Sequence, residues 1–210
     1  MKLADYLSPL PFCAVLRGIT PAEIAPIGGA LSDAGFRILE VPLNSPNPFD
    51  SIRALATRFG TQCLVGAGTV IDPADVERVA DAGGRLVVMP HADVRVIAAA
   101  KRHGLICMPG VATPTEAFAA LAAGADGLKM FPAEALPPAA LKAWRAVLPR
   151  DTLVLAVGGM RPDTLRAYWD AGANGFGTGS NLYTPGAAVA GVAAAARAYA
   201  DAARALPARG

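Results

Sequence analysis

Short apolar runs and longer, more polar stretches alternate along the chain. The apolar runs are rich in valine, leucine and isoleucine, and they are continuous instead of alternating with polar residues. Such runs are typical of parallel strands that are covered by helices on both faces. Several of the intervening stretches begin with a proline and an acidic residue soon after it, as in "TPAEI", "DPADVERV", "TPTEAF" and "RPDTLRAY". This combination marks the first turn of a helix.

One sequence motif recurs, and its spacing predicts the number of strands. It appears as "DAGFRILEVP", "DAGGRLVVMP", "AAGADGLKMFP" and "DAGANGFGTG", with glycines at Gly35, Gly83, Gly124 and Gly172. Each copy is read as a helix end, a glycine in the left-handed conformation, and a short strand. The spacing of about forty to fifty residues leaves room for one more unit in each interval. Those units begin in "FGTQCLVGAGT", "HGLICMPG" and "LPRDTLVLAVGG", and the opening run "FCAVLRG" completes eight predicted strands.

Eight strand-helix units in 210 residues predict a (β/α)8 TIM barrel with short loops, in which residues 1–210 form a single domain. The alternative is an open, doubly wound sheet. No GxGxxG follows the first strand, which disfavours that alternative.

Composition narrows the function to small-molecule chemistry. Hydrophobic residues make up 53% of the chain and charged residues 17%, with a formal net charge of +2. No basic run indicates nucleic-acid binding, and no segment predicts a membrane span or a targeting signal. Three cysteines without metal-ligand spacing indicate buried thiols in a reducing cytoplasm, and two isolated histidines predict no metal site.

Charged residues interrupt three of the apolar runs. Arg17 ends the first run, Glu40 lies in "ILEVPLNS", and Lys129 lies in "LKMFP". In a barrel the carboxyl ends of the strands carry the chemistry, so we expect these side chains to share one cavity. A buried ion-pair network without chemistry is the alternative. Desolvation offsets most of the attraction in such networks, so the cluster indicates a catalytic use instead.

Two glycine-containing turns predict a phosphate site. The seventh predicted strand ends in "VGGMRPDTL" and the eighth in "GTGSNLYTPG", which places Gly158, Gly159, Gly179 and Ser180 at strand-to-helix turns. Backbone N–H groups at such turns bind anions, and the loops after strands seven and eight are the usual phosphate position in barrels.

Together these groups describe a reaction. A lysine in a desolvated pocket gives up its proton more readily and can attack a carbonyl carbon. Glu40 is the one acid at the inward strand ends and would transfer the protons that imine formation needs, while Arg17 suits a planar carboxylate. The residues therefore predict a Schiff-base reaction of a phosphorylated keto acid.

The chain also resembles the class I aldolases that act on 2-dehydro-3-deoxy-6-phospho sugar acids. The segments "AVLRGIT", "LEVPLNSP", "GAGTV", "MPG", "LKMFPAE", "AVGG" and "GSNLY" match in order. The resemblance implies an enzyme without cofactor or metal that binds pyruvate, a cytoplasmic location and a homotrimer. It implies that Lys129 is the Schiff-base lysine and Glu40 the general acid/base.

The resemblance assigns the remaining site residues as well. Arg17 and Thr69 would hold the carboxylate of the pyruvyl end, and Pro90 and Phe131 would shape the wall around the imine. The phosphate would bind at Gly158, Gly159, Gly179 and Ser180.

Two branches of this family act on substrates that are epimeric at C4. The gluconate-type enzymes carry an arginine where this chain has Asn44, and a threonine where it has Val157. A hydroxyl near C4 could hydrogen-bond one epimer, whereas valine cannot. The segments "LRGIT" and "PLNSP" favour the galactonate branch, whose reaction yields pyruvate and glyceraldehyde 3-phosphate. The alternatives are the gluconate epimer, a non-covalent phosphate-barrel isomerase or synthase, and a non-enzymatic sensor.

Overall fold

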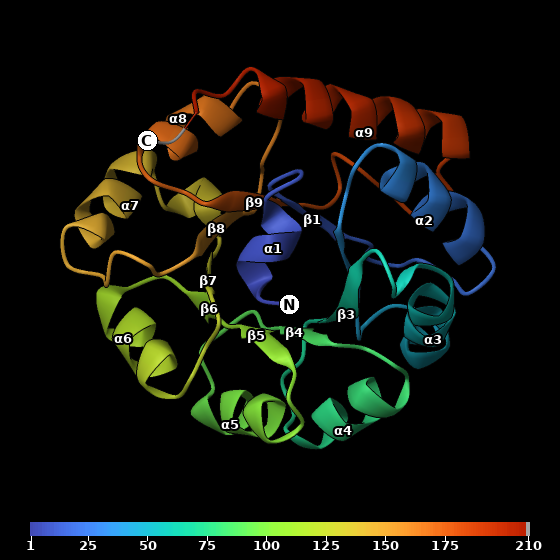
Figure 1. Cartoon of the computed structure of the whole chain (residues 1–210), viewed down its shortest axis with the longest axis horizontal. Helices are drawn as coiled ribbons and strands as arrows, with labels where there is room; N and C mark the ends of the chain where they lie inside the picture. Colours follow the sequence, from blue (N-terminus) through green and yellow to red (C-terminus); the bar gives the residue numbers. More distant parts are fainter. Residues whose placement is uncertain (209–210) are drawn as a thin grey trace.

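Parallel strands form the wall of a barrel, and helices surround it in a ring (Figure 1). The computed structural model describes residues 1–208. The strands are β1 Phe12–Val15, β2 Ile38–Pro42, β3 Leu64–Gly68, β4 Leu86–Val88, β5 Ile106–Met108, β6 Gly110–Val111, β7 Leu128–Met130, β8 Val154–Val157 and β9 Gly175–Thr178. The helices are α1 Leu3–Leu7, α2 Ile24–Asp33, α3 Pro48–Phe59, α4 Ala74–Asp81, α5 Val94–Arg102, α6 Pro114–Ala122, the 3-10 turn η1 Ala133–Ala135, α7 Pro138–Arg145, α8 Leu165–Asp170 and α9 Val189–Arg204.

Pro109 divides the fifth barrel strand into β5 and β6. The strand order in the sheet is β5-β4-β3-β2-β1-β9-β8-β7-β6, so β5 pairs with β4 and β6 pairs with β7. Proline has no N–H to donate to a ladder, but its carbonyl still accepts a bond of 2.9 Å from the Lys129 N–H. The continuous segment from β5 to β6 therefore closes the sheet. Eight barrel strands, each followed by a helix, confirm the predicted (β/α)8 fold.

The recurring glycines end helices as the sequence predicts. Gly35, Gly83, Gly124 and Gly172 have φ angles of 101°, 82°, 96° and 108°, which lie in the left-handed region. Gly60 differs, because it ends α3 with a φ of −62°. A strand begins within a few residues of each of these helix ends, so the recurring motif marks successive strand-helix units of the barrel.

The prolines locate helix starts less well. Pro114 is the first residue of α6, as predicted, and Pro73 is the N-cap residue directly before α4. By contrast, α2 and α8 begin three residues after Pro21 and Pro162, which lie in turns that precede the helices. Among residues 1–208, no helix combines the length and the apolar character needed to cross a membrane.

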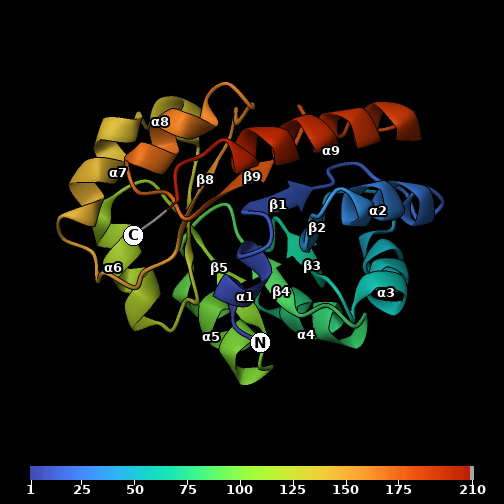
Figure 2. The ribbon, with the colours of Figure 1, turned by 45° about the horizontal axis from the view of Figure 1, so that its top comes forward.

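The sequence gives no signal for the short helix α1, which closes one end of the barrel (Figures 1 and 2). Its buried residues Leu3, Tyr6 and Leu7 pack against the inner side chains of the strands. The Leu3 side chain lies beside Gly127, which directly precedes β7, and the Leu7 side chain lies beside Gly175, the first residue of β9. Helix α1 therefore lies at the amino-terminal ends of the strands. The opposite, carboxyl end is left for a ligand.

The final helix α9 completes the ring by packing on α2 (Figure 1). Val192, Ala196 and Tyr199 are buried on its inner face. The Tyr199 hydroxyl donates to the Met160 carbonyl at 2.7 Å, which ties α9 to the turn that follows β8. The helix therefore supports a loop at the carboxyl end of the barrel as well as the core.

Gly66 tests how closely the barrel wall is packed. A Cβ at this position would lie 2.0 Å from the Leu86 carbonyl oxygen on the neighbouring strand. We expect Gly66→Ala to lower the free energy of unfolding by about 1–3 kcal/mol or more, because backbone cannot give way cheaply. In contrast, Gly29→Ala, in α2 with nothing within 4 Å of the new methyl group, should raise it by about 0.5–1 kcal/mol. Urea denaturation of both variants measures the difference, and equal effects would contradict this packing.

Candidate active site

Strand geometry places Lys129 and Glu40 inside the barrel. Successive strand residues face opposite sides, so Leu128 and Met130 join the core between sheet and helices while Lys129 points inward. Glu40 is likewise flanked by Leu39 and Val41, both of which lie in that outer core. The two side chains are almost fully buried, with exposed fractions of 7% for Lys129 and 1% for Glu40.

Burial dominates the electrostatics of Glu40. It raises the pKa of the carboxyl above its usual value, and the positive charges of Lys129 and Arg17 offset only part of that rise. The carboxylate packs against Gly68 of β3, because a Cβ added to this glycine would lie 2.5 Å from Glu40 Oε1. Its Oε2 is buried without a hydrogen-bond partner among residues 1–208. A buried carboxyl in this state is well suited to holding and releasing a proton.

The Lys129 ammonium group lies over an aromatic face. Its Nζ is 4.6 Å from the centroid of the Phe131 ring, a cation–π distance. Lys129 and Phe131 both line a cavity of about 150 Å³ at the carboxyl end of the barrel. The amine is therefore buried by the protein but open to a small ligand.

Most of the predicted site residues meet in that cavity. Its lining consists of Val15, Arg17, Lys129, Phe131, Glu134, Val157, Gly158, Gly159, Met160, Gly177, Gly179, Ser180 and Asn181. The lysine, the arginine, the aromatic wall, the valine and all four predicted phosphate-binding residues are thus brought together. Glu40 lies buried beside them.

The position of Arg17 differs from the one that the sequence predicts. The sequence places it on an apolar strand, but it lies in the exposed turn after β1. Its Nη1 donates to the Asn44 side-chain oxygen at 2.8 Å, and the next residue, Gly18, donates its N–H to the Ser45 hydroxyl at 2.9 Å. The turns after β1 and β2 therefore hold each other, and Asn44 fixes the guanidinium over the cavity.

The two glycine turns have the geometry that their sequence predicts. Gly158 and Gly159 adopt φ angles of 112° and 63°, which residues with a side chain rarely adopt. Gly179 and the exposed Ser180 follow β9 on the neighbouring side of the cavity. We therefore still expect the backbone N–H groups of both turns to bind an anion.

Thr69 and Pro90 are not among the residues that line the cavity. Thr69 follows β3 with a φ of 56°, an uncommon left-handed conformation for a threonine. Pro90 follows β4, and its carbonyl approaches the space beside Gly110. Both residues are at the carboxyl end of the barrel, where the sequence places them, but neither lines the 150 Å³ cavity. Their predicted roles remain predictions.

Sequence reasoning missed Glu134. This residue lies in η1, the turn that follows β7, and its carboxylate lies against the Gly158–Gly159 turn. An added Cβ on Gly158 would be 2.3 Å from Glu134 Oε2. In the sequence, Glu134 is the last residue of "FPAE". Only the course of η1 in the structure shows that its carboxylate lies at the cavity.

Glu23 joins the loop after β1, which carries Arg17, to the loop after β9. Its carboxylate accepts bonds from the Thr20 N–H and hydroxyl, the Tyr183 hydroxyl and the Gly186 N–H, at 2.7 to 3.0 Å. Burial raises its pKa, but these hydrogen bonds together outweigh burial and bring the pKa to about 2. The loop after β9, which carries Ser180, is therefore anchored to the loop after β1.

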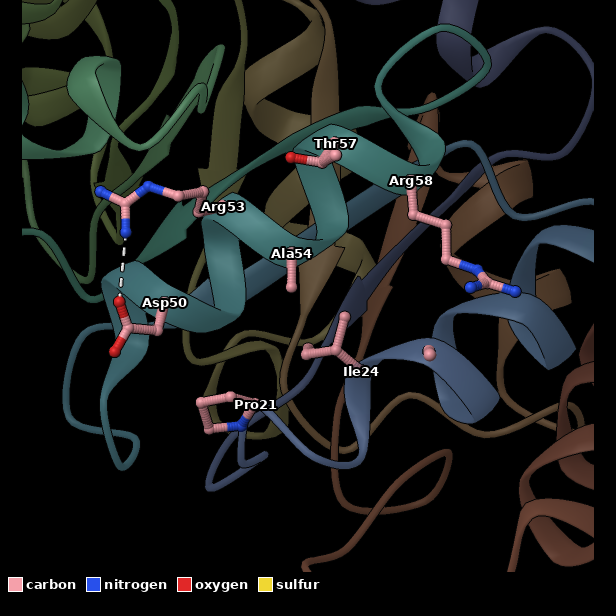
Figure 3. A pocket seen from close by; sticks show the side chains of 8 residues that line it. Pro21, Ile24, Asp50, Arg53, Ala54, Thr57 and Arg58 are labelled. Carbon is pink, nitrogen blue, oxygen red and sulfur yellow. Dashed lines mark hydrogen bonds and ion pairs between the residues drawn. The ribbon is translucent and has the colours of Figure 1, made fainter.

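A larger hollow lies on the outside of the barrel. It has a volume of about 660 Å³ and lies between α2 and α3 (Figure 3). Its charged side chains include the exposed ion pair between Arg53 and Asp50. No buried titratable group lines it, so the smaller cavity is the better candidate for chemistry. In residues 1–208, no three histidine, cysteine or acidic side chains are grouped to hold a metal ion.

Comparison with known proteins gives the family. Residues 4–193 match the family model of the KDPG and KHG aldolases. The chain belongs to this family. Its members are class I aldolases, and the (β/α)8 fold described above is the one that its solved relatives share.

The most informative relatives are close. A probable 2-dehydro-3-deoxy-6-phosphogalactonate aldolase of Rhizobium meliloti (strain 1021) is 51% identical over 84% of this chain and 83% of its own length. The 2-dehydro-3-deoxy-6-phosphogalactonate aldolase of Escherichia coli (strain K12) is 47% identical over 95% of this chain and 98% of its own. A solved structure described as "Native KDPGal structure" superposes with a TM-score of 0.91, at 47% identity, over 93% of this chain and 95% of that one.

The raised pKa of Glu40 has a consequence for stability. The folded protein binds the proton of the Glu40 carboxyl more tightly than the unfolded chain does, so this proton stabilises the fold. The stabilisation is complete below the unfolded pKa of about 4.5, and it is lost as the pH rises through the folded pKa. At pH 7.5, above the unfolded pKa, the stabilisation that the bound proton gives at low pH is therefore reduced. We expect Glu40→Gln to raise Tm at pH 7.5 by about 2–4 °C, roughly 1 kcal/mol.

Thermal unfolding between pH 4 and 8 measures this effect. The gain in Tm should shrink toward pH 4, and Glu77→Gln, at an exposed position on α4, should change Tm little at any pH. A lower Tm of Glu40→Gln at pH 7.5 would mean that attraction to Lys129 and Arg17 outweighs burial.

Proposed function

We propose that this protein is a class I aldolase that cleaves 2-dehydro-3-deoxy-6-phosphogalactonate to pyruvate and glyceraldehyde 3-phosphate, in galactonate catabolism. The observation that carries the proposal is the buried pair of Lys129 and Glu40 at a cavity flanked by two glycine turns. The names of the two relatives above support the galactonate epimer, as do Asn44 and Val157 in this chain.

The reaction begins at the lysine. The Lys129 amine attacks the C2 ketone, and Glu40 delivers a proton to the carbinolamine oxygen so that it leaves as water. The result is a protonated imine on Lys129. Arg17 holds the substrate carboxylate, and Phe131 packs beside the imine.

Carbon-carbon cleavage then uses the imine as an electron sink. The C3–C4 bond breaks, its electron pair moves toward the iminium nitrogen, and a base removes the C4 hydroxyl proton to form the aldehyde. Glyceraldehyde 3-phosphate leaves from the glycine turns. Protonation of the enamine at C3 and hydrolysis of the imine release pyruvate and regenerate Lys129.

Borohydride trapping tests the covalent step. With pyruvate and borohydride, we expect a mass increase on the peptide that contains Lys129 and irreversible loss of cleavage activity. Lys129→Ala should lower kcat by at least about 1000-fold, because the covalent route is lost. Lys142→Ala, at an exposed position on α7, is the matched control and should keep activity within about two-fold. No adduct, or an adduct on a surface lysine such as Lys101, would count against the aldolase and favour a non-covalent phosphate-barrel isomerase or synthase.

Val157 tests the choice of epimer. Its side chain lines the cavity and offers no hydrogen bond to a substrate hydroxyl. The wild-type protein should cleave the galactonate epimer at least about ten-fold more efficiently than the gluconate epimer. Val157→Thr should reduce that ratio by about 5- to 10-fold, measured as kcat/KM on both substrates. An unchanged ratio would mean that Val157 does not contribute to the discrimination at C4.

The assembly and location are proposals of the same kind. We propose a cytoplasmic homotrimer, since the family resemblance implies one. The chain has a mass of 21.4 kDa, so a trimer has a mass of about 64 kDa. Sedimentation equilibrium at micromolar concentration distinguishes the two. A monomer would exclude the trimer.

A further inference from the structure

Glu134 adds an unassigned carboxylate to the cavity. It is the one acidic side chain among the described residues that line the cavity, and it lies in η1 directly after the Lys129 strand. Its carboxylate lies against both glycines of the turn after β8. An added Cβ would approach Glu134 Oε2 to 2.3 Å at Gly158 and Glu134 Cγ to 2.6 Å at Gly159.

The carboxylate is free to accept a hydrogen bond from a ligand. Within residues 1–208, Glu134 has no ion pair and no side-chain hydrogen bond, although a carboxylate can accept several. The other two side chains nearby are weaker acceptors. Val157 has no polar atom, and the Asn181 amide, whose N–H donates to the Met160 carbonyl at 3.3 Å, has only a neutral acceptor oxygen. Glu134 is therefore the strongest acceptor on this wall.

Charge decides which part of the substrate Glu134 can face. A carboxylate repels a phosphate group and attracts hydroxyl donors, and hydrogen bonds to a charged acceptor are stronger than neutral ones. In the proposed function, Lys129 holds C2 and the glycine turns hold the phosphate on C6. Glu134 lies beside one of those turns, so the carbon next to the phosphate-bearing carbon comes closest. That carbon is C5, which carries a hydroxyl.

We propose that Glu134 is a specificity residue that accepts a hydrogen bond from the C5 hydroxyl of the substrate, which is the 2-hydroxyl of glyceraldehyde 3-phosphate. This inference rests on the proposed aldolase function and extends it to the acceptor aldehyde. The glycines at 158 and 159 then have two roles: their N–H groups face the anion, and their missing side chains leave room for the Glu134 carboxylate.

The test compares two aldehydes in the condensation with pyruvate. D-Glyceraldehyde 3-phosphate carries the hydroxyl, and 3-oxopropyl phosphate differs only in lacking it. The wild-type protein should prefer the first by about 10- to 100-fold in kcat/KM, because a charged acceptor is left unpaired with the second. Glu134→Ala should reduce this preference to about two-fold or less. Glu134→Gln keeps an acceptor oxygen without the charge and should fall between them.

Pyruvate half-reactions separate the outcomes. Exchange of the pyruvate C3 protons in deuterium oxide and borohydride trapping at Lys129 use no C5 hydroxyl, so Glu134→Ala should keep both within about two-fold. Glu77→Gln on α4 is the control for loss of one exposed acidic charge and should change neither preference nor exchange.

Three results would overturn the inference. If Glu134→Ala condenses and exchanges normally but keeps the wild-type preference, Glu134 does not bind this hydroxyl and the aldolase proposal stands. If Glu134→Ala loses exchange as well, the residue supports the whole site and is not a specificity residue. If the wild-type protein shows neither exchange nor trapping, the proposed function and this inference both fail.

Discussion

The burial of two opposite charges inside an apolar barrel is the constraint on which the site depends. Lys129 and Glu40 have exposed fractions of 7% and 1%, and their neighbours along each strand face the outer core. Burial raises the pKa of Glu40, and attraction to Lys129 and Arg17 offsets only part of that rise. The fold therefore holds a pair that is unfavourable for stability, and a covalent use of the lysine with proton transfer by the acid gives a physical reason to keep it.

Space at the mouth of the barrel comes from residues with small or absent side chains. Gly68 leaves room for the Glu40 carboxylate, and the Gly158–Gly159 turn leaves room for that of Glu134. The loops around this space are fastened to one another, by Arg17 with Asn44 and by Glu23 with the loop after β9. Loops that are fastened in this way need little reorganisation to hold a ligand in place.

Helix α1 and the loops give the barrel two different ends. At the amino-terminal end, Leu3, Tyr6 and Leu7 fill the interior and exclude water. At the carboxyl end, the same interior is capped by charged and glycine residues and stays open to a ligand. The family match over residues 4–193 agrees with this division, because the matched region contains the complete barrel wall and every residue of the proposed site.

The sequence alone determined the barrel, its strand count and most of the residues that line the candidate cavity. Local signals sufficed there: left-handed glycines such as Gly35, continuous apolar runs, and charges such as Lys129 within those runs. Only the tertiary structure decided three matters. It showed helix α1, which is too short to have a periodic pattern, and the position of Arg17 beyond its strand. It also brought Glu134 back over Gly158, a contact between segments more than twenty residues apart that no local pattern encodes, because it depends on how β7 and β8 pair.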